Sequence, residues 1–145
     1  MEQKKLYSVL LIDDDEPTTF MYKMVLEESG WISNIQIAQG GGEALNLLAK
    51  GVENILEQRT DYPDIVFLDI NMPKMDGWEF LQGLKELGEK KKKRPVVVML
   101  STSLNPDDEM RAAQIQEISA YRHKPLTVAM IREIVAKYLP WSNSG

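Results

Sequence analysis

Residues 65–77 read IVFLDINMPKMDG, an apolar run that ends in an aspartate and continues into a segment with proline and glycine. A short run of β-branched and aromatic residues bounded by turn residues is typical of a buried β-strand. We therefore predict a strand over Ile65–Leu68, with the carboxylate of Asp69 exposed at its tip. This carboxylate is the starting point for both the fold and the function.

Three other strand-like runs end in polar residues of complementary chemistry. The run 9–12 leads into Asp13-Asp14-Asp15, the run 96–100 leads into Ser101, and the run around Ala120-Tyr121 leads into Lys124-Pro125. In an open parallel sheet the ligand site lies just beyond the carboxyl ends of the strands. We expect these side chains to meet, although they are far apart in the sequence.

Short runs of β-branched residues alternate with segments of helical periodicity, which is the pattern of an α/β protein with a parallel sheet. We predict five βα units in a three-layer sandwich. The first strand is Tyr7–Ile12, and 34–38 alternates like an edge strand. The predicted helices run from Pro17 to before Gly30, from about Glu43, from Gly77, from Pro106, and from about Thr127 to Leu139.

Apolar positions at helical spacing are candidates for the core. On the first helix we predict that Phe20, Met21, Met24 and Val25 form the buried face, and Met110 and Met130 read as packing residues of their helices. The candidates on the other helices are Ala44, Leu45, Leu47, Leu48, Phe80, Leu81, Leu84, Val128, Ile131, Val135 and Tyr138.

Composition narrows the class of protein. With 145 residues, 17 basic and 22 acidic side chains, the chain carries a net charge of −5 and no cysteine. The excess of acidic side chains argues against broad nucleic-acid binding. The apolar stretch near the start of the sequence is too short for a signal peptide or a membrane span. We expect a cytoplasmic protein without membrane contact, with a single domain over 1–145, a core over about 6–139 and no output domain. Its expected partners are proteins and a cation.

The clustered acids suggest metal-assisted phosphoryl chemistry. Two unit charges about 5 Å apart repel by about 3 kcal/mol at an effective dielectric of 20, so a group of carboxylates needs a counter-charge. Oxygen ligands suit a small hard cation such as Mg²⁺, for which Asp14 and Asp69 are the first candidates. An aspartate beside such a cation can attack phosphorus and form an aspartyl phosphate. Lys124 would then bind phosphoryl oxygens, and the Ser101 hydroxyl could donate to one of them.

In this order, these residues resemble the receiver domain of two-component response regulators, including its stand-alone, chemotaxis-regulator-like members. The resemblance spans about Leu6 to Leu139. It comprises an acidic pair after the first strand, an aspartate followed by Met-Pro-Lys-Met-Asp-Gly at 72–77, a serine after the fourth strand and Lys-Pro after the fifth. It implies a flavodoxin-like (βα)5 fold with strand order 2-1-3-4-5.

The resemblance also implies a role for each site residue. Asp69 would be the phosphorylation site, and Mg²⁺ would be held by Asp13, Asp14, Asp69 and the backbone carbonyl of Asn71. Ser101 and Lys124 would contact the phosphoryl group, Ser101 and Tyr121 would act as the switch, and the bond before Pro125 is a candidate cis peptide. The phosphodonor would be a sensor histidine kinase or a histidine phosphotransfer protein. The output would pass through 106–115, 118–122 and 127–139 to a partner protein, a self-dimer or a phosphorelay.

Several alternatives stay open at this point. Asp15 is the spare acid if Ile12 ends the first strand, and Thr102 and Ser103 are alternative hydroxyls to Ser101. His123 is more simply an exposed loop residue, and the basic run Lys90–Arg94 is more simply a solvated loop than a docking site.

Two other functions compete with the receiver. An aspartate-nucleophile phosphatase of the haloacid dehalogenase type would need an acid two residues after its nucleophile, where this chain has Asn71. A receiver that has become a constitutive binding module would bind its partner stably and without metal.

Overall fold

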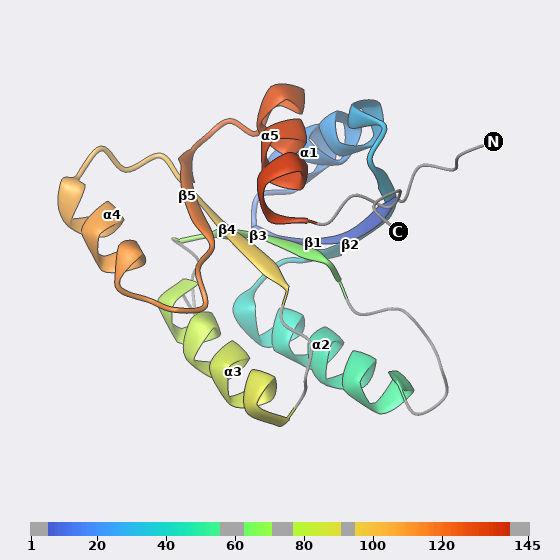
Figure 1. Ribbon diagram of the computed structural model, residues 1–145, viewed down its shortest axis with the longest axis vertical. Helices are drawn as coiled ribbons and strands as arrows, with labels where there is room; N and C mark the ends of the chain where they lie inside the picture. Colours follow the sequence, from blue (N-terminus) through green and yellow to red (C-terminus); the bar gives the residue numbers. More distant parts are fainter. Residues whose placement is uncertain (1–5, 56–62, 71–76, 91–94, 140–145) are drawn as a thin grey trace.

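The structure is a computed structural model that describes residues 6–55, 63–70, 77–90 and 95–139. Its five strands form one parallel sheet in the order β2-β1-β3-β4-β5 (Figure 1). The strands are β1 Tyr7–Ile12, β2 Ile32–Ala38, β3 Ile65–Asp69, β4 Val96–Ser101 and β5 Ala120–His123. The helices are α1 Glu16–Ser29, α2 Gly41–Ile55, α3 Gly77–Lys90, α4 Pro106–Ala113 and α5 Val128–Tyr138. The predicted fold class and strand order are confirmed.

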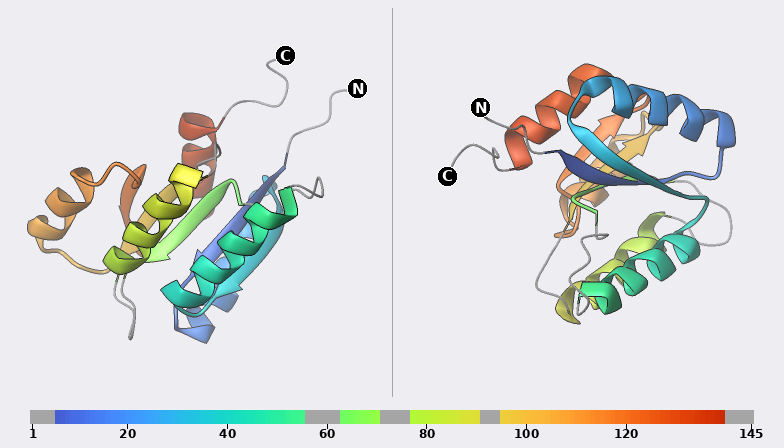
Figure 2. Two further views of the ribbon diagram at one scale, coloured as in Figure 1. Left: turned by 90° about the horizontal axis from the view of Figure 1, so that it is seen from below. Right: turned by 90° about the vertical axis from the view of Figure 1, so that its right-hand side faces the viewer.

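The sheet lies between two layers of helices, which Figure 2 shows edge-on with α1 and α5 on one side and α2 and α3 on the other. Successive residues of a strand point to opposite faces, so each strand serves two cores. In β1, Val9 and Leu11 pack toward α1 and α5, whereas Leu10 and Ile12 pack toward α2 and α3. The central strands are therefore apolar almost throughout, as the three-layer prediction requires.

Element boundaries differ from the predictions by a few residues. Both β3 and β4 continue one residue further than their apolar runs, so Asp69 and Ser101 are the last residues of their strands. The fifth strand begins at Ala120 and not at Ile118. Helix α4 ends at Ala113, two residues before the end of the range 106–115 that was predicted for it. The functional side chains consequently project from the ends of the strands themselves.

The predicted buried face of α1 is wrong. Phe20, Met21 and Met24 are 65%, 60% and 54% exposed, while Val25 is partly buried. The buried residues of this helix are instead Thr19, Tyr22, Leu26 and Ser29. The two small hydroxyl residues can enter the interior because each donates to a carbonyl of its own helix: Thr19 to Glu16 at 3.0 Å and Ser29 to Leu26 at 2.6 Å.

The other core predictions hold more closely. Ala44, Leu48, Phe80, Leu81, Leu84, Ile131 and Val135 are buried, and Leu45, Leu47 and Tyr138 pack against the core at its edge. Val128 is partly buried, and Ile134, which was not among the candidates, is buried. Met130 packs at the edge of the core, and Met110 is 61% exposed. No helix in the described segments has the length and apolar composition needed to cross a membrane.

Candidate functional site

The register of the sheet brings the predicted site residues to one edge. Ile12 pairs with Leu68, and Asp69 pairs with Leu100, so the residues that follow β1 lie level with the ends of β3 and β4. Ser101 in turn pairs with His123, which places Lys124 beside them. The sheet therefore assembles two aspartates, a serine and a lysine from four separate strands.

Three carboxylates form the acidic cluster, which we define as Asp13, Asp14 and Asp69. One oxygen from each lies within 4.8 Å of the others. Asp13 is buried, Asp14 is exposed, and the Asp69 side chain is 11% exposed. Carboxylate oxygens that converge on one point and are partly open to water are the kind of donor that Mg²⁺ takes in proteins. The residues present thus fit a magnesium ion, as predicted.

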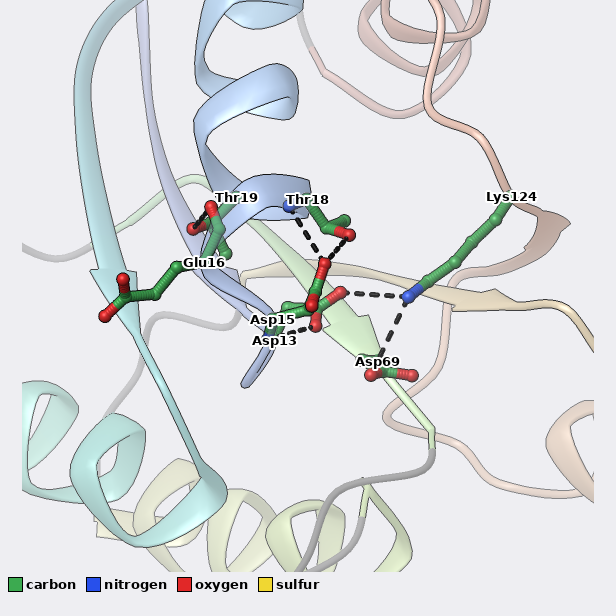
Figure 3. A network of polar contacts seen from close by, with 7 residues as sticks. All are labelled: Asp13, Asp15, Glu16, Thr18, Thr19, Asp69 and Lys124. Carbon is green, nitrogen blue, oxygen red and sulfur yellow. Dashed lines mark hydrogen bonds and ion pairs between the residues drawn. The ribbon is translucent and has the colours of Figure 1, made fainter.

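Asp15 has a different task from its two neighbours. It is the N-cap of α1, where its carboxylate accepts from the backbone N–H of Thr18 at 3.1 Å and from the Thr18 hydroxyl (Figure 3). These two hydrogen bonds, led by that of the hydroxyl, lower the pKa of Asp15. Its own N–H donates to Asp13 Oδ1 at 3.0 Å, which helps to orient the buried acid. Asp15 therefore caps α1, which agrees with the prediction that it is the spare acid of the three.

Lys124 supplies the positive charge of the site. Its Nζ lies 2.9 Å from Asp13 Oδ2 and 3.7 Å from Asp69 Oδ2, and Figure 3 shows it reaching between the two carboxylates. Burial opposes the ammonium charge, but the hydrogen bond to Asp13 and the charges of Asp69 and Asp13 outweigh it and raise the pKa of Lys124. The side chain therefore stays protonated. The Lys124-Pro125 peptide is cis, as the resemblance implied.

Ser101 is fully buried at the end of β4. Its hydroxyl oxygen accepts from the backbone N–H of Ser103 at 2.9 Å, and the Ser103 hydroxyl donates to Asp108 of α4 at 2.7 Å. Thr102, the other alternative, is exposed. Of the three hydroxyls, Ser103 is thus committed to α4, while Ser101 lies within the sheet edge that carries Asp69.

Tyr121 projects from β5 with an unusual hydroxyl. This group is buried and has no hydrogen-bond partner among the described residues. Leaving a buried polar group without a hydrogen bond costs about 1–3 kcal/mol, so a new hydrogen-bond partner for this hydroxyl would stabilise the protein. The Tyr121 ring meets that of His123 edge-on, with centroids 5.7 Å apart, and His123 itself is exposed as predicted.

Two predicted features lie outside the described residues: the backbone ligand Asn71 and the basic run beyond Lys90. One residue near the site was missed by the sequence reasoning. Tyr22 of α1 is buried, and burial raises its pKa while the neighbouring charge of Lys124 opposes that rise. Its spacing with Leu26 and Ser29 on one helical face could have signalled that it points inward.

Gly77, the first residue of α3, packs directly against the end of β3. A Cβ at this position would lie 2.9 Å from Ile70 Cα and 3.1 Å from the carbonyl oxygen of Asp69. Because both are backbone atoms, we expect Gly77→Ala to lower the free energy of unfolding by about 1–3 kcal/mol in urea titrations.

Gly42 provides the matched control for that substitution. A Cβ there meets nothing within 4 Å, and the residue lies in the first turn of α2. Gly42→Ala is expected to leave the stability unchanged or to raise it by up to about 1 kcal/mol. Equal effects at the two glycines would show that the close approach at Asp69 is unimportant.

Comparison with known proteins points to one family. Residues 9–136 match the response regulator receiver domain. The probable methanogenesis regulatory protein FilR2 of Methanothrix harundinacea is 29% identical over 150 aligned positions, which cover 99% of this chain and 91% of the relative. The polar-differentiation response regulator DivK of Brucella ovis is 28% identical, with 91% of this chain and 95% of the relative covered.

Solved structures agree with these sequence matches. A two-component response regulator from Cytophaga hutchinsonii superposes with a TM-score of 0.79 at 33% identity, covering 92% of this chain and 96% of the other. The receiver domain of the histidine kinase CKI1 from Arabidopsis thaliana, complexed with Mg²⁺ and BeF₃⁻, gives a TM-score of 0.74 at 25% identity, covering 90% and 91% of the two chains.

Proposed function

The chain belongs to the response regulator receiver domain family, and from this premise we propose that it accepts a phosphoryl group on Asp69 in a Mg²⁺-dependent reaction. The donor would be a phosphohistidine on a sensor kinase or on a phosphotransfer protein. The observation that carries the proposal is the acidic cluster, which is open to water at Asp14 and bridged by Lys124 between Asp13 and Asp69.

The transfer exchanges one bond to phosphorus for another. An oxygen of Asp69 forms a bond to phosphorus as the bond from phosphorus to the donor nitrogen breaks, and the imidazole regains its electron pair. Asp13, Asp14 and Asp69 would hold Mg²⁺, with the backbone carbonyl of Asn71 as a proposed further ligand. When bound, Mg²⁺ supplies the positive charge that offsets the charge on the phosphoryl oxygens.

Lys124 supports this reaction with a charge that is already in place. Its ammonium sits 3.7 Å from Asp69 and is kept protonated by Asp13, so it can turn to a phosphoryl oxygen without taking up a proton. We assign Ser101 to the same phosphoryl group because it ends the neighbouring strand β4. Tyr121, whose hydroxyl has no hydrogen-bond partner among the described residues, is the proposed second part of the switch.

The proposed output is a changed surface on α4, β5 and α5. Ser101 precedes α4, Tyr121 lies in β5 and Lys124 precedes α5, so a shift at the site reaches these elements directly. The recipient would be a separate protein, a second copy or a relay partner. We propose no turnover of a substrate, and the phosphatase alternative lacks support because the position two residues after Asp69 is Asn71.

Intact mass measurement tests the proposal. After incubation with acetyl phosphate and Mg²⁺, the protein is expected to gain about 80 Da, the mass of one phosphoryl group, and to lose it at alkaline pH, as an acyl phosphate does. Removal of Mg²⁺ with EDTA should suppress the gain. A protein that binds its partner equally with and without the phosphoryl group would support the constitutive binding module instead.

A further inference from the structure

Helix α4 is weakly anchored to the rest of the molecule. Of its eight residues only Ala112 is buried, and Met110 on the same helix is 61% exposed. Burial of apolar side chains is the main force that holds a helix against a sheet. Individual polar contacts therefore supply a larger share of the anchoring of α4 than they do for the other helices.

The first of these contacts joins α4 to the end of β4. Ser101 accepts from the N–H of Ser103, and the Ser103 hydroxyl donates to Asp108 in the first turn of α4 at 2.7 Å. Asn105 caps the helix by accepting from the N–H of Asp107. The first turn of α4 is thus linked to Ser101 through hydrogen bonds of Ser103.

The second contact joins α4 to α3. The guanidinium carbon of Arg111 lies 4.0 Å from the centroid of the Trp78 ring, which is a cation–π contact. Figure 1 and the left view of Figure 2 show α4 near α3. Trp78 is itself fixed relative to the phosphorylation site, because Gly77 packs on the backbone of Asp69 and Ile70 and donates to the Ile70 carbonyl at 3.0 Å.

We propose that Trp78 and Arg111 form a latch that holds α4 in the arrangement described here, and that the latch opposes the switch started at Asp69. The inference rests on the proposed function. A phosphoryl oxygen that draws Ser101 toward Asp69 also displaces the Ser103–Asp108 contact at the start of α4. The latch holds the other end of the helix to α3, whose first residue packs on the backbone of Asp69 and Ile70. Displacement of α4 must therefore break it.

This coupling has a defined size and sign. Anything that weakens the latch favours the displaced arrangement, and it therefore favours binding of a phosphoryl group or its analogue by the same factor. Arg111 is exposed, and cation–π contacts at exposed sites correspond to about a two- to fivefold change in such an equilibrium. The latch would set the threshold of the switch without touching its chemistry.

The test is a double-mutant cycle on Trp78→Leu and Arg111→Met, read by hydrogen exchange of the α4 amides. Arg111→Met removes the charge but keeps a long apolar chain, and it is expected to speed exchange about two- to fivefold. The double variant should exchange no faster than the faster single variant, because the second substitution has no contact left to remove. The control is Arg132→Met, an exposed arginine of α5, which should leave α4 unchanged.

A second readout tests the link to Asp69. Titration calorimetry with beryllofluoride and Mg²⁺ is expected to show about two- to fivefold tighter binding in Arg111→Met than in the wild type. Unchanged exchange in Arg111→Met overturns the latch, and faster exchange with unchanged beryllofluoride affinity overturns its coupling to the switch. A wild type that neither binds beryllofluoride nor gains a phosphoryl group overturns the proposed function, and the exchange comparison then still decides whether the latch exists.

Discussion

Asp69→Asn is expected to abolish the gain of a phosphoryl group from acetyl phosphate. The substitution keeps the shape of the side chain at the end of β3, but it replaces the charged nucleophilic oxygen with a neutral amide. It also replaces one of the three carboxylates that could hold Mg²⁺ with an uncharged and weaker ligand. Intact mass measured over time should therefore show no labile addition where the wild type is fully modified, a loss of more than about a hundredfold in rate.

The matched control for this variant is Asp15→Asn. Asp15 belongs to the same run of acids but serves as the cap of α1, a position where asparagine is as well suited as aspartate. This variant should accept the phosphoryl group at close to the wild-type rate. A labile addition to Asp69→Asn would show that another carboxylate is the acceptor, and loss of acceptance in Asp15→Asn would return Asp15 to the site.

The site was predictable because its residues are placed by strand ends. A parallel sheet whose strands are buried on both faces requires apolar runs, and the first polar residue after each run must then lie at the carboxyl edge. Asp13, Asp69 and Ser101 follow this rule, Lys124 is the first residue after β5, and the structure brings the four together. The identity of the spare acid depended on a single boundary, the end of β1 at Ile12.

The face of α1 could not be predicted in the same way, because this helix carries apolar residues on two faces. One face carries Phe20, Met21 and Met24, and another carries Tyr22 and Leu26. Hydrophobic periodicity alone predicts that the face with more apolar residues is buried. The tertiary structure decides in favour of the smaller set. Thr19 can enter the interior because its hydroxyl is satisfied within the helix, a contact that no pattern of apolar residues contains.

Contacts between side chains could not be predicted from the sequence either. The sequence favours Ser101 but leaves Thr102 and Ser103 as alternative hydroxyls, and the hydrogen bond to Asp108 shows that Ser103 is engaged with α4. The same holds for the Tyr121 hydroxyl, which is buried and has no hydrogen-bond partner in the part of the chain that the structure describes. The sequence thus predicts which groups reach the edge of the sheet, whereas the structure decides which of them are already engaged.

Lys124→Met is expected to destabilise the protein strongly and to make it depend on Mg²⁺. The side chains of Lys124 and Asp13 are 17% and 6% exposed, so the substitution leaves a largely buried carboxylate without its partner beside the nearby Asp69. Removing one member of a buried ion pair costs about 3–5 kcal/mol, and the partial exposure here reduces this to about 2–4 kcal/mol. The midpoint of thermal unfolding without Mg²⁺ should fall by several degrees.

Addition of Mg²⁺ should restore much of the lost stability, because the cation replaces the missing positive charge at the acidic cluster. The increase in the unfolding midpoint on adding Mg²⁺ is therefore expected to be larger in Lys124→Met than in the wild type. Lys50→Met, at an exposed position of α2, controls for the loss of a positive charge far from the cluster and should show the wild-type response. An equal Mg²⁺ response in Lys124→Met and the wild type would mean that the three carboxylates do not form the cation site, since a shared site must respond to the lysine that lies between two of its ligands.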